Sequence, residues 1–371
     1  MPPIIKMKQI FIFILVLFFC SCTKEAEKSS VKQLSISFKE SSNDIFKTSQ
    51  LIDSIYYIVL DSTLYLGNID EIKVVNDIFY CIDKHNGTIS KINQTGKFLG
   101  SFNKSGHAKS EYVTMMDADI SQNEVIHVYD GASDRILSYS RYGNFIKAFN
   151  LDDIARDFVA LDNGDYLFYT PDYQMGGHSG LWKTDSVGNF KKQLISVDEG
   201  FGYGIILPAY INRYNQNVYG LIGGEDKDNF YMMSSDTIMT TLHINFNIEI
   251  PKRMQNEMPI DVENYKGQIY FKHSYIESNR WIVFTCTDFD KSITCYYDKK
   301  NQKCYKITSP DNYVDDMNFI RASGGDCVFN GRYWLTLIEP SIIKESISLS
   351  RLFPNISENS NPVIRIAVLS E

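Results

Sequence analysis

Short hydrophobic runs with polar residues at alternate positions recur along most of the chain and predict β-strands. The runs are separated by turn pairs such as Asn86-Gly87 and Thr95-Gly96, and Asn-Gly is the strongest short-range signal of a β-hairpin. Residues 340–352, by contrast, place apolar side chains at roughly helical spacing, which predicts a short helix. The pattern as a whole indicates an all-β protein.

Two segments of the chain, residues 80–102 and 127–149, align without a gap. Identical residues stand 47 positions apart at five sites: Asp83 and Asp130, Ile89 and Ile136, Gly96 and Gly143, Phe98 and Phe145, and Phe102 and Phe149. A further Gly-Asn-Phe turn, residues 188–190, follows 45 positions after Gly143. A period in the forties with several short strands per unit is typical of a β-propeller blade.

The repeat predicts one domain, residues 45–371, folded as a six-bladed β-propeller of four-stranded antiparallel blades. The six expected blades cover about residues 68–102, 114–149, 156–195, 205–246, 267–308 and 316–369. A strand at Ile52–Leu60 precedes the first full repeat. Because propellers commonly remove an open edge by sharing a blade between the two termini, we expect this strand to join the C-terminal blade.

The first residues of the chain are expected to be a signal peptide, residues 1–21. Lys6 and Lys8 precede an apolar run at residues 10–19, which is too short to span a membrane. The following Cys20-Ser21-Cys22 resembles the lipobox of bacterial lipoproteins, and Cys22, after the small Ser21, fits lipid attachment better than Cys20 does. Residues 22–44 are then a lipidated N-terminus and flexible tether. We therefore expect an exported protein, anchored by lipid to the cell envelope at the outer membrane.

Charge and motifs exclude several classes of function. The net charge of −8 comes without a basic cluster, which argues against a nucleic-acid partner. The six histidines are dispersed, and no nucleophile elbow, phosphate-binding loop or dinucleotide fingerprint is present. The acidic pairs are interpreted as solvated turn carboxylates: Asp117 and Asp119, Asp226 and Asp228, and Asp315 and Asp316. The sequence thus predicts no catalytic residue, no metal and no cofactor.

Three cysteines, Cys286, Cys295 and Cys304, stand nine residues apart in the fifth expected blade. If the hairpins turn at residues 290–291 and 299–300, Cys286 faces Cys295 and Cys295 faces Cys304. Directly opposed residues of an antiparallel pair lie near disulfide range. The alternatives are one disulfide, a thiolate metal site, or three small buried side chains in the core.

Aromatic residues gather in and beside two glycine-rich insertions of the third and fourth blades. These candidate ligand-binding residues are Tyr173, His178, Trp182, Phe201, Tyr203, Tyr210 and Tyr214. Glycine lets a loop approach a ligand closely, and aromatic faces supply apolar area with a polar tip. Such a surface suits a small molecule, a glycan, a peptide or a partner protein. The competing interpretation is that these rings cover the core under long loops.

Several motifs resemble the six-bladed, NHL-like β-propeller lipoproteins of Bacteroides-type bacteria. They are residues 51–60, Gly67-Asn-Ile, Gly96-Lys-Phe-Leu, Gly106 to Glu111-Tyr112, Asp134-Arg-Ile, and the closing residues 358–366. The resemblance implies the propeller fold and the envelope location. Where that family usually has Gly-Pro-Gly-Glu-Tyr, this chain keeps only Glu111-Tyr112, after Ala108-Lys-Ser110. The family is mostly uncharacterised, so the resemblance implies no activity.

The favoured functional prediction is a non-enzymatic recognition or scaffold protein that binds its ligand on the loop face. One alternative is a propeller enzyme of lactonase or lyase type, with polar side chains converging on the axis. Another is an accessory subunit of an envelope nutrient-uptake complex, which would carry a flat apolar patch on its outer rim. The membrane contact in each case is the N-terminal lipid alone.

Overall fold

The computed structural model describes eleven segments of the chain. They are residues 34–37, 44–61, 66–170, 177–196, 211–214, 217–221, 229–233, 238–245, 271–287, 292–319 and 327–371. The chain divides into two compact units, Met1–Lys32 and Gln33–Glu371, and all described residues belong to the second. The predicted signal peptide and Cys22 therefore lie outside the described residues, as does most of the tether.

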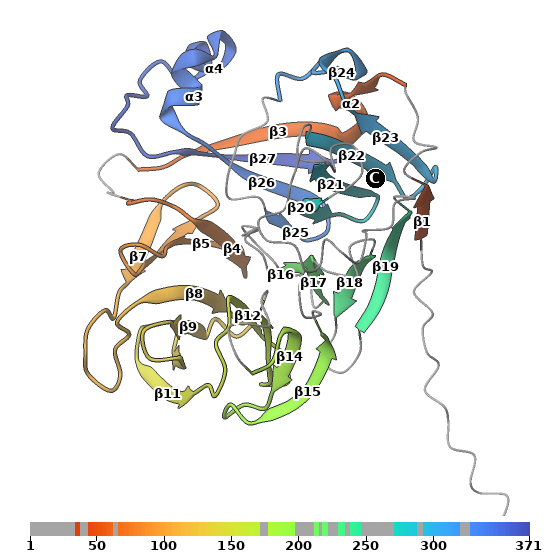
Figure 1. Cartoon of the computed structure of the whole chain (residues 1–371). Helices are drawn as coiled ribbons and strands as arrows, with labels where there is room; N and C mark the ends of the chain where they lie inside the picture. Colours follow the sequence, from red (N-terminus) through yellow and green to blue (C-terminus); the bar gives the residue numbers. More distant parts are fainter. Residues whose placement is uncertain are drawn as a thin grey trace, which may run out of the picture. The chain divides into compact units, whose positions relative to one another are not determined.

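Five four-stranded antiparallel sheets form the body of this unit (Figure 1). The first three contain β4 (Glu71–Val75), β5 (Ile78–Asp83), β6 (Thr88–Asn93) and β7 (Phe98–Phe102); β8 (Met115–Ile120), β9 (Ile126–Asp130), β10 (Arg135–Tyr139) and β11 (Phe145–Asn150); and β12 (Asp157–Ala160), β13 (Tyr166–Thr170), β14 (Gly180–Thr184) and β15 (Phe190–Ile195). The other two contain β20 (Phe271–Glu277), β21 (Trp281–Thr287), β22 (Ser292–Asp298) and β23 (Lys303–Ile307); and β25 (Cys327–Phe329), β26 (Tyr333–Ile338), β27 (Val363–Leu369) and β3 (Ile52–Val59).

A further sheet has five strands in the order β1-β19-β18-β17-β16. Its antiparallel strands are β16 (Ile211–Tyr214), β17 (Asn217–Leu221), β18 (Asn229–Met233) and β19 (Ile238–Asn245), and β1 (Leu34–Ser37) pairs in parallel with β19. Five sheets therefore have the predicted four-stranded form, one fewer than the six expected. The difference arises because a segment before residue 38, expected in the tether, adds a strand to the open edge of β19.

The sequence repeat corresponds to a repeated hairpin. Gly96, Gly143 and Gly188 adopt left-handed backbone conformations, with φ of 82°, 82° and 94°, and each leads into the last strand of its sheet. A β-carbon on Gly96 would lie 2.6 Å from the carbonyl oxygen of Val59, so the turn also packs closely against β3. Glycine is required at these positions because other residues rarely adopt such φ values.

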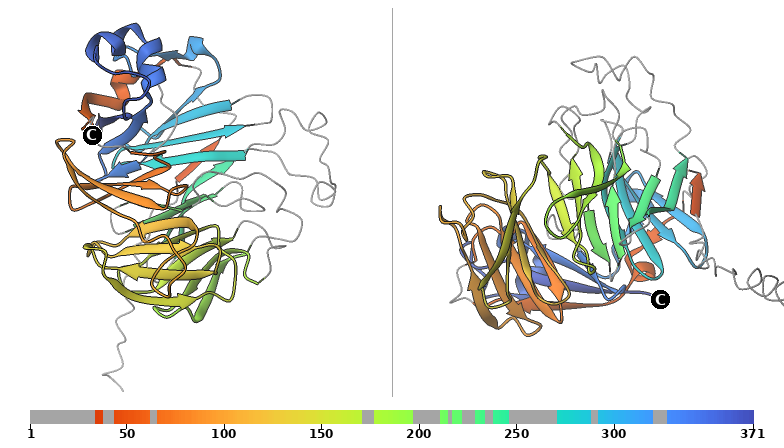
Figure 2. Two further views of the ribbon diagram at one scale, coloured as in Figure 1. Left: turned by 90° about the vertical axis from the view of Figure 1, so that its left-hand side faces the viewer. Right: turned by 90° about the horizontal axis from the view of Figure 1, so that it is seen from below.

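Neighbouring sheets pack face to face through apolar clusters. Ile89 of the first sheet packs with Val128 and Leu137 of the second, and Tyr129 of the second packs with Trp182 of the third. The first strands of neighbouring sheets also touch: β4 contacts β8, and β8 contacts β12 (Figures 1 and 2). Repeated four-stranded sheets joined in this way define a β-propeller.

The strand before the first repeat pairs with the last strand of the chain. β3 pairs antiparallel with β27 over its whole length, from Val59 opposite Val363 to Ile52 opposite Leu369. Residues near position 55 and residues near position 366 therefore belong to one sheet.

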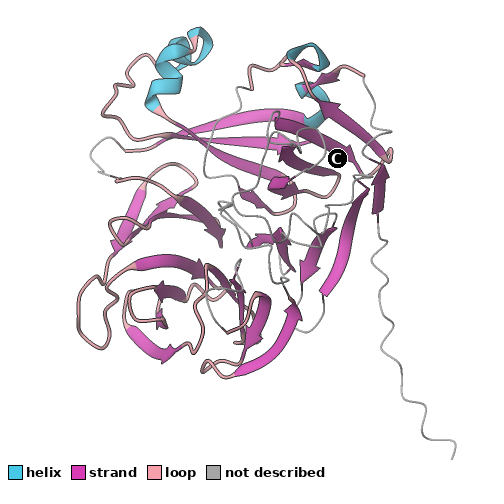
Figure 3. Ribbon diagram, viewed as in Figure 1, coloured by secondary structure: helices cyan, strands magenta, loops and turns pink. Residues whose placement is uncertain are grey.

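Helices are few among the described residues (Figure 3). They are α2 (Thr48–Leu51), the 3-10 turn Pro310–Asn312, α3 (Pro340–Glu345) and α4 (Ile347–Leu352). A two-stranded parallel pair joins β2 (Phe46–Lys47) to β24 (Tyr313–Val314). The single helix predicted at residues 340–352 is thus two helices, because Ser346 ends α3 and caps α4 by accepting from the backbone N–H of Leu349. Within the described segments, no helix is long and apolar enough to cross a membrane.

Candidate functional site

The connections between sheets lie at the same end of the propeller as the starts of β4, β8 and β12, the first strands of their sheets. We call these first strands the inner strands. In an antiparallel sheet, the first strand begins at the edge where the second strand ends. The turn at residues 84–87 and the connection at residues 103–114 therefore lie where β4 and β8 begin. The connection at residues 151–156 reaches the start of β12 in the same way. We refer to this edge as the loop-bearing end.

Six charged side chains from three neighbouring sheets meet at this end. They are Glu71 and Lys73 of β4, Lys84 of the turn after β5, Asp117 and Asp119 of β8, and Asp157 of β12. We call this group the inner cluster. It forms because positions 71 and 73, like 117 and 119, are two residues apart in a strand and so point to the same face.

The two lysines of the inner cluster each lie between carboxylates. The Nζ of Lys84 is 2.7 Å from Asp117 Oδ1 and 3.5 Å from Glu71 Oε2. The Nζ of Lys73 is 3.1 Å from Glu71 Oε1 and 3.5 Å from Asp119 Oδ1. Glu71 therefore bridges both ammonium groups, and the charges alternate in sign along the cluster.

The buried carboxylates also serve the backbone of the next sheet. Asp117 and Asp119 accept hydrogen bonds from two N–H groups of β12, at Phe158 and Ala160, over 3.2 and 2.9 Å. Asp157 accepts one from the first N–H of β16 over 2.9 Å. The first strand of a sheet has an open edge whose N–H groups need partners. These aspartates supply them and tie neighbouring sheets together.

Two aspartates of the inner cluster share a hydrogen bond and differ in acidity. Burial raises the pKa of Asp157 well above its usual range, and the neighbouring negative charge of Asp117 raises it further. Burial also disfavours ionised Asp117, but Lys84 and Lys73 outweigh it and lower the pKa of that carboxyl. Two adjacent carboxyls that share one proton behave in this way. Asp157 is therefore the carboxyl of the pair that holds the shared proton.

Both lysines of the inner cluster stay charged. Burial by itself lowers the pKa of Lys73, but the charges of Glu71 and Asp119 raise it overall. The pKa of Lys84 is raised in the same manner, chiefly by Asp117. The cluster is therefore a fixed array of ammonium donors and carboxylate acceptors.

The inner cluster is open on one side. The side chains of Lys84 and Glu71 are 31% and 27% exposed and Lys73 is 14% exposed, whereas Asp117 and Asp119 are 2% and 0% exposed. Lys84 and Glu71 are thus the most exposed side chains of the cluster, and we call these two its mouth. No group of three His, Cys, Asp or Glu side chains suited to a metal ion occurs in the described parts of the chain.

The sequence analysis missed this group and misplaced two of its members. The prediction that Asp117 and Asp119 are solvated turn carboxylates is wrong, because both side chains are buried in β8. The usable signal was the spacing of charges at alternate positions inside a strand that is otherwise apolar. Residues 71–75 carry the same spacing in the preceding sheet. Of the other two acidic pairs, Asp226 and Asp228 lie outside the described residues, and Asp315 and Asp316 follow β24 rather than joining this cluster.

The predicted aromatic site is only partly described. Tyr173, Phe201, Tyr203 and Tyr210 lie outside the described residues, and only the backbone of Tyr214 is described, at the end of β16. Their role as ligand contacts stays a prediction.

Two members of that aromatic set are described, and they behave differently. Trp182 is 2% exposed, stacks on Phe168 and donates to Thr170 Oγ1, so it is a core side chain. His178 is one-third exposed, stacks on Phe190 with ring centroids 3.8 Å apart, and lies 2.5 Å from Asp153 Oδ2. His178 is the member whose exposure suits ligand contact.

The three cysteines of the fifth expected blade lie in one core cluster but are not directly opposed. Cys286 pairs with Ile293, Cys295 with Phe284 and Lys306, and Cys304 with Tyr297. The expected pairing was wrong by two residues because the turns fall at different positions. Each neighbouring pair is diagonal on the same face, a placement that puts α-carbons about 7–8 Å apart. All three thiols are free in this structure.

Tyr112, from the motif that carries the family resemblance, has a clear structural role. It is fully buried, donates from its hydroxyl to the carbonyl of Gly87 over 2.7 Å, and accepts from the N–H of Lys104 over 2.9 Å. Glu111 accepts from the N–H of Ala108 over 3.0 Å. The Glu-Tyr pair thus holds the connection between the first two sheets without the Gly-Pro-Gly sequence.

The repeated sheets and the inner cluster define the class of protein as a β-propeller with a charged site at its loop-bearing end. The chain belongs to the family described as Domain of unknown function (DUF4934), which matches residues 32–368. No curated protein matches this chain.

An alignment with a solved structure supports the same fold. A crystal structure from Bacteroides fragilis NCTC 9343, described as a "putative exported protein", aligns with a TM-score of 0.71 at 16% identity, covering 92% of this chain and 100% of that one. A member of the DUF4221 family from Bacteroides vulgatus ATCC 8482 aligns with a TM-score of 0.45 at 10% identity, covering 86% and 97%. Virginiamycin B lyase from Staphylococcus aureus aligns with a TM-score of 0.40 at 11% identity, covering 85% and 99%.

Proposed function

We propose that this chain is an exported, lipid-anchored propeller that binds a small polar molecule at the mouth of the inner cluster. The observation that carries the proposal is the meeting of Glu71, Lys84 and Asp117, from two neighbouring sheets, at the loop-bearing end. The cluster offers donors and acceptors in fixed positions, and ligand sites typically combine a preformed scaffold with a few such groups. Binding rather than chemistry is the simpler use of this array.

The proposal includes six blades in a closed ring. The contacts of the inner strands support it, because β12 touches β16, β17 touches β20, β20 touches β25, and β25 returns to β4. On this view the five-stranded sheet is the sixth blade, and β1 is an addition to it. The pairing of β3 with β27 supports closure of the ring within one blade.

Lipid attachment at Cys22 is tested by metabolic labelling. Cells that express the full chain are fed an alkyne analogue of palmitate, and the protein is recovered and probed for the label. We expect labelling that Cys22→Ala abolishes and Cys20→Ala leaves intact. Equal labelling of the Cys22→Ala variant would contradict this assignment.

Ligand binding at the inner cluster is tested by thermal stabilisation of the purified protein against a library of small polar metabolites. A ligand that binds only the folded state raises the melting temperature. We expect Lys84→Met to remove the shift given by any hit, while Lys97→Met, an exposed lysine at the opposite turn of the same sheet, retains it. Hits that both variants bind equally would place the ligand elsewhere.

An enzyme with an axial active site is the second candidate, and one observation favours it. Asp157 and Asp117 combine a protonated and an ionised carboxyl in hydrogen-bond contact. Such a pair can supply a general acid and a general base. Turnover of a library hit, lost in Asp157→Asn but with binding retained, would favour the enzyme over the recognition protein.

A further inference from the structure

We propose that the ligand of the inner cluster is a neutral saccharide, held by hydroxyl groups that bridge Lys84 and Glu71. This inference rests on the proposed function, because it names the ligand class of the same site. It follows from the donors that remain, from the balance of charge, and from the spacing of the exposed groups.

The exposed ammonium groups retain donor capacity. An ammonium group carries three N–H donors. Lys84 directs its Nζ at Asp117 and Glu71, and Lys73 directs its Nζ at Glu71 and Asp119. Two carboxylate partners among the described residues thus leave one N–H of each lysine for a further acceptor. Each oxygen of Glu71 meets one lysine and keeps a second lone pair for a donor.

The charge balance disfavours an ionic ligand. With Asp157 protonated, three carboxylates face two ammonium groups, so the inner cluster carries a net charge of about −1. An anion placed against Lys84 would also meet the carboxylate of Glu71 at the mouth, in a cluster that already carries excess negative charge. A cation would compete with lysines that already lie between the carboxylates. A neutral ligand enters without separating any of these ion pairs.

A hydroxyl group matches the exposed pair directly. Lys84 Nζ and Glu71 Oε2 lie 3.5 Å apart at the mouth, so a group placed against both must accept from one and donate to the other. A single hydroxyl oxygen does both, whereas a peptide divides these roles between its N–H and its carbonyl. Lys73 and Glu71 Oε1 form a second such pair at 3.1 Å. Two adjacent ion pairs therefore suit two neighbouring hydroxyls of a sugar ring.

The test measures binding by isothermal titration calorimetry on the purified propeller. The probes are neutral hexasaccharides of glucose (α-1,4, β-1,4 and β-1,3 linked), mannose and xylose, together with a galacturonate oligomer and trialanine. We expect at least one neutral hexasaccharide to bind. Glu71→Gln and Lys84→Met should each weaken it by about tenfold or more, since each removes a charged hydrogen-bond partner.

Two matched variants control for general effects of charge. Asp77→Asn and Lys97→Met change exposed residues in the two turns at the opposite end of the same sheet, and we expect unchanged affinity. Because Glu71→Gln removes a contact of both lysines, its melting temperature and circular dichroism are compared with wild type. Should it fail to fold, Lys84→Met, which leaves Glu71 and Lys73 paired, supplies the same comparison.

The outcomes separate this inference from the proposed function. If no neutral hexasaccharide binds, or if Glu71→Gln and Lys84→Met bind as tightly as wild type, the saccharide inference is wrong. Binding of trialanine or galacturonate that Lys84→Met abolishes would overturn the ligand class and leave the site intact. Tight saccharide binding that neither variant weakens would overturn the site as well.

Discussion

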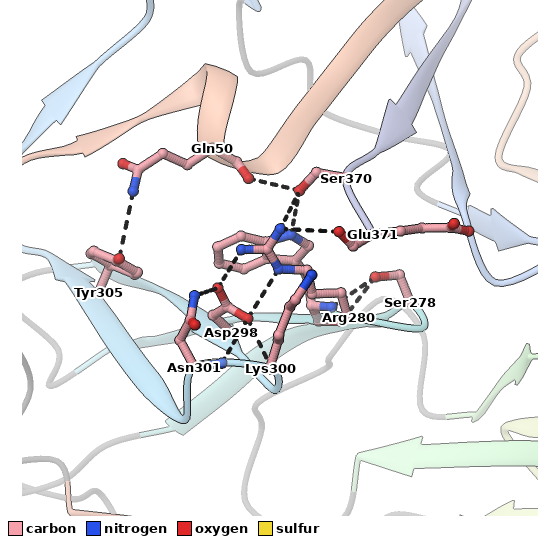
Figure 4. Close-up of polar contacts among 10 residues, drawn as sticks. Gln50, Ser278, Arg280, Asp298, Lys300, Asn301, Tyr305, Ser370 and Glu371 are labelled. Carbon is pink, nitrogen blue, oxygen red and sulfur yellow. Dashed lines mark hydrogen bonds and ion pairs between the residues drawn. The ribbon is translucent and has the colours of Figure 1, made fainter.

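The indole N–H of Trp281 donates a hydrogen bond of 2.8 Å to the hydroxyl of Ser370. That hydroxyl donates in turn to the backbone carbonyl of Gln50 over 2.7 Å (Figure 4). Trp281 belongs to β21, Ser370 follows β27, and Gln50 lies in α2, so one hydroxyl joins three segments. Arg280, paired with Asp298 at 2.6 Å, also reaches Ser370 from the same hairpin. This junction ties the sheet of β21 to the sheet that β3 and β27 share.

Replacing the central hydroxyl should weaken this junction. Ser370→Ala leaves the buried N–H of Trp281 and the carbonyl of Gln50 without their shared partner, and we expect a loss of about 1–3 kcal/mol in the free energy of unfolding. Urea denaturation followed by tryptophan fluorescence measures it. Ser292→Ala, at an exposed position of β22, should change the free energy by less than about 0.5 kcal/mol. Equal effects of the two variants would contradict the role of Ser370.

Tyr112 should stabilise the connection between the first two sheets through its hydroxyl. Tyr112→Phe preserves the ring but leaves the carbonyl of Gly87 and the N–H of Lys104 without this partner, so we expect a loss of about 1–3 kcal/mol. The exposed Tyr142 is the matched control, and Tyr142→Phe should be close to neutral. Thermal and urea denaturation measure both. A neutral Tyr112→Phe would show that the buried hydroxyl contributes nothing.

The fold could be predicted from the sequence because its signals are local and repeated. Gly96 and Gly143 stand in equivalent turns, and Asp83 and Asp130 each accept hydrogen bonds in the turn that follows the second strand of a sheet. Turn residues and strand alternation repeat with the blade, so each copy reinforces the others. The fifth strand β1 carries no such signal. Its placement depends on an open edge of β19, which is a tertiary feature.

The inner cluster could not be predicted in the same way because its members come from different blades. Lys84 and Asp117 are 33 positions apart and meet only after two sheets pack side by side. The sequence shows an acidic pair at positions 117 and 119 but does not show which lysine lies between the carboxylates. The cysteine pairing failed for a related reason. The hairpin turn between β21 and β22 is centred one residue earlier than predicted, so Ile293 rather than Cys295 lies opposite Cys286.

The shared proton of Asp157 should make stability depend on pH. The pKa of Asp157 is raised in the folded state, so between about pH 4 and that raised pKa the folded protein binds more protons than the unfolded chain. Stability from this group is therefore present at low pH and is lost as the pH rises through the folded pKa. Asp117, with a lowered pKa, acts in the opposite sense below about pH 4.

Asp157→Asn isolates this contribution. Asparagine keeps an acceptor for the N–H of Ile211 and a donor toward Asp117, but it cannot ionise. We expect the variant to gain stability relative to wild type as the pH rises from about 5 toward the raised pKa of Asp157, as measured by urea denaturation across a pH series. Asp77→Asn, at an exposed turn, should follow the wild-type profile. Parallel profiles for Asp157→Asn and wild type would contradict the shared proton.

The buried thiols should resist alkylation until the protein unfolds. Cys286 and Cys295 are 0% exposed, and burial raises the pKa of the Cys295 thiol, so the reactive thiolate is scarce and inaccessible. Cys81 is buried with a pKa raised to about 12, whereas Cys327 is partly exposed. We expect iodoacetamide to modify Cys327 in the native protein and the others only in denaturant, as read by peptide mass spectrometry. A peptide linking Cys295 to Cys286 or Cys304 in unreduced protein would instead restore the disulfide that the sequence left open, at the cost of a backbone shift from the diagonal arrangement.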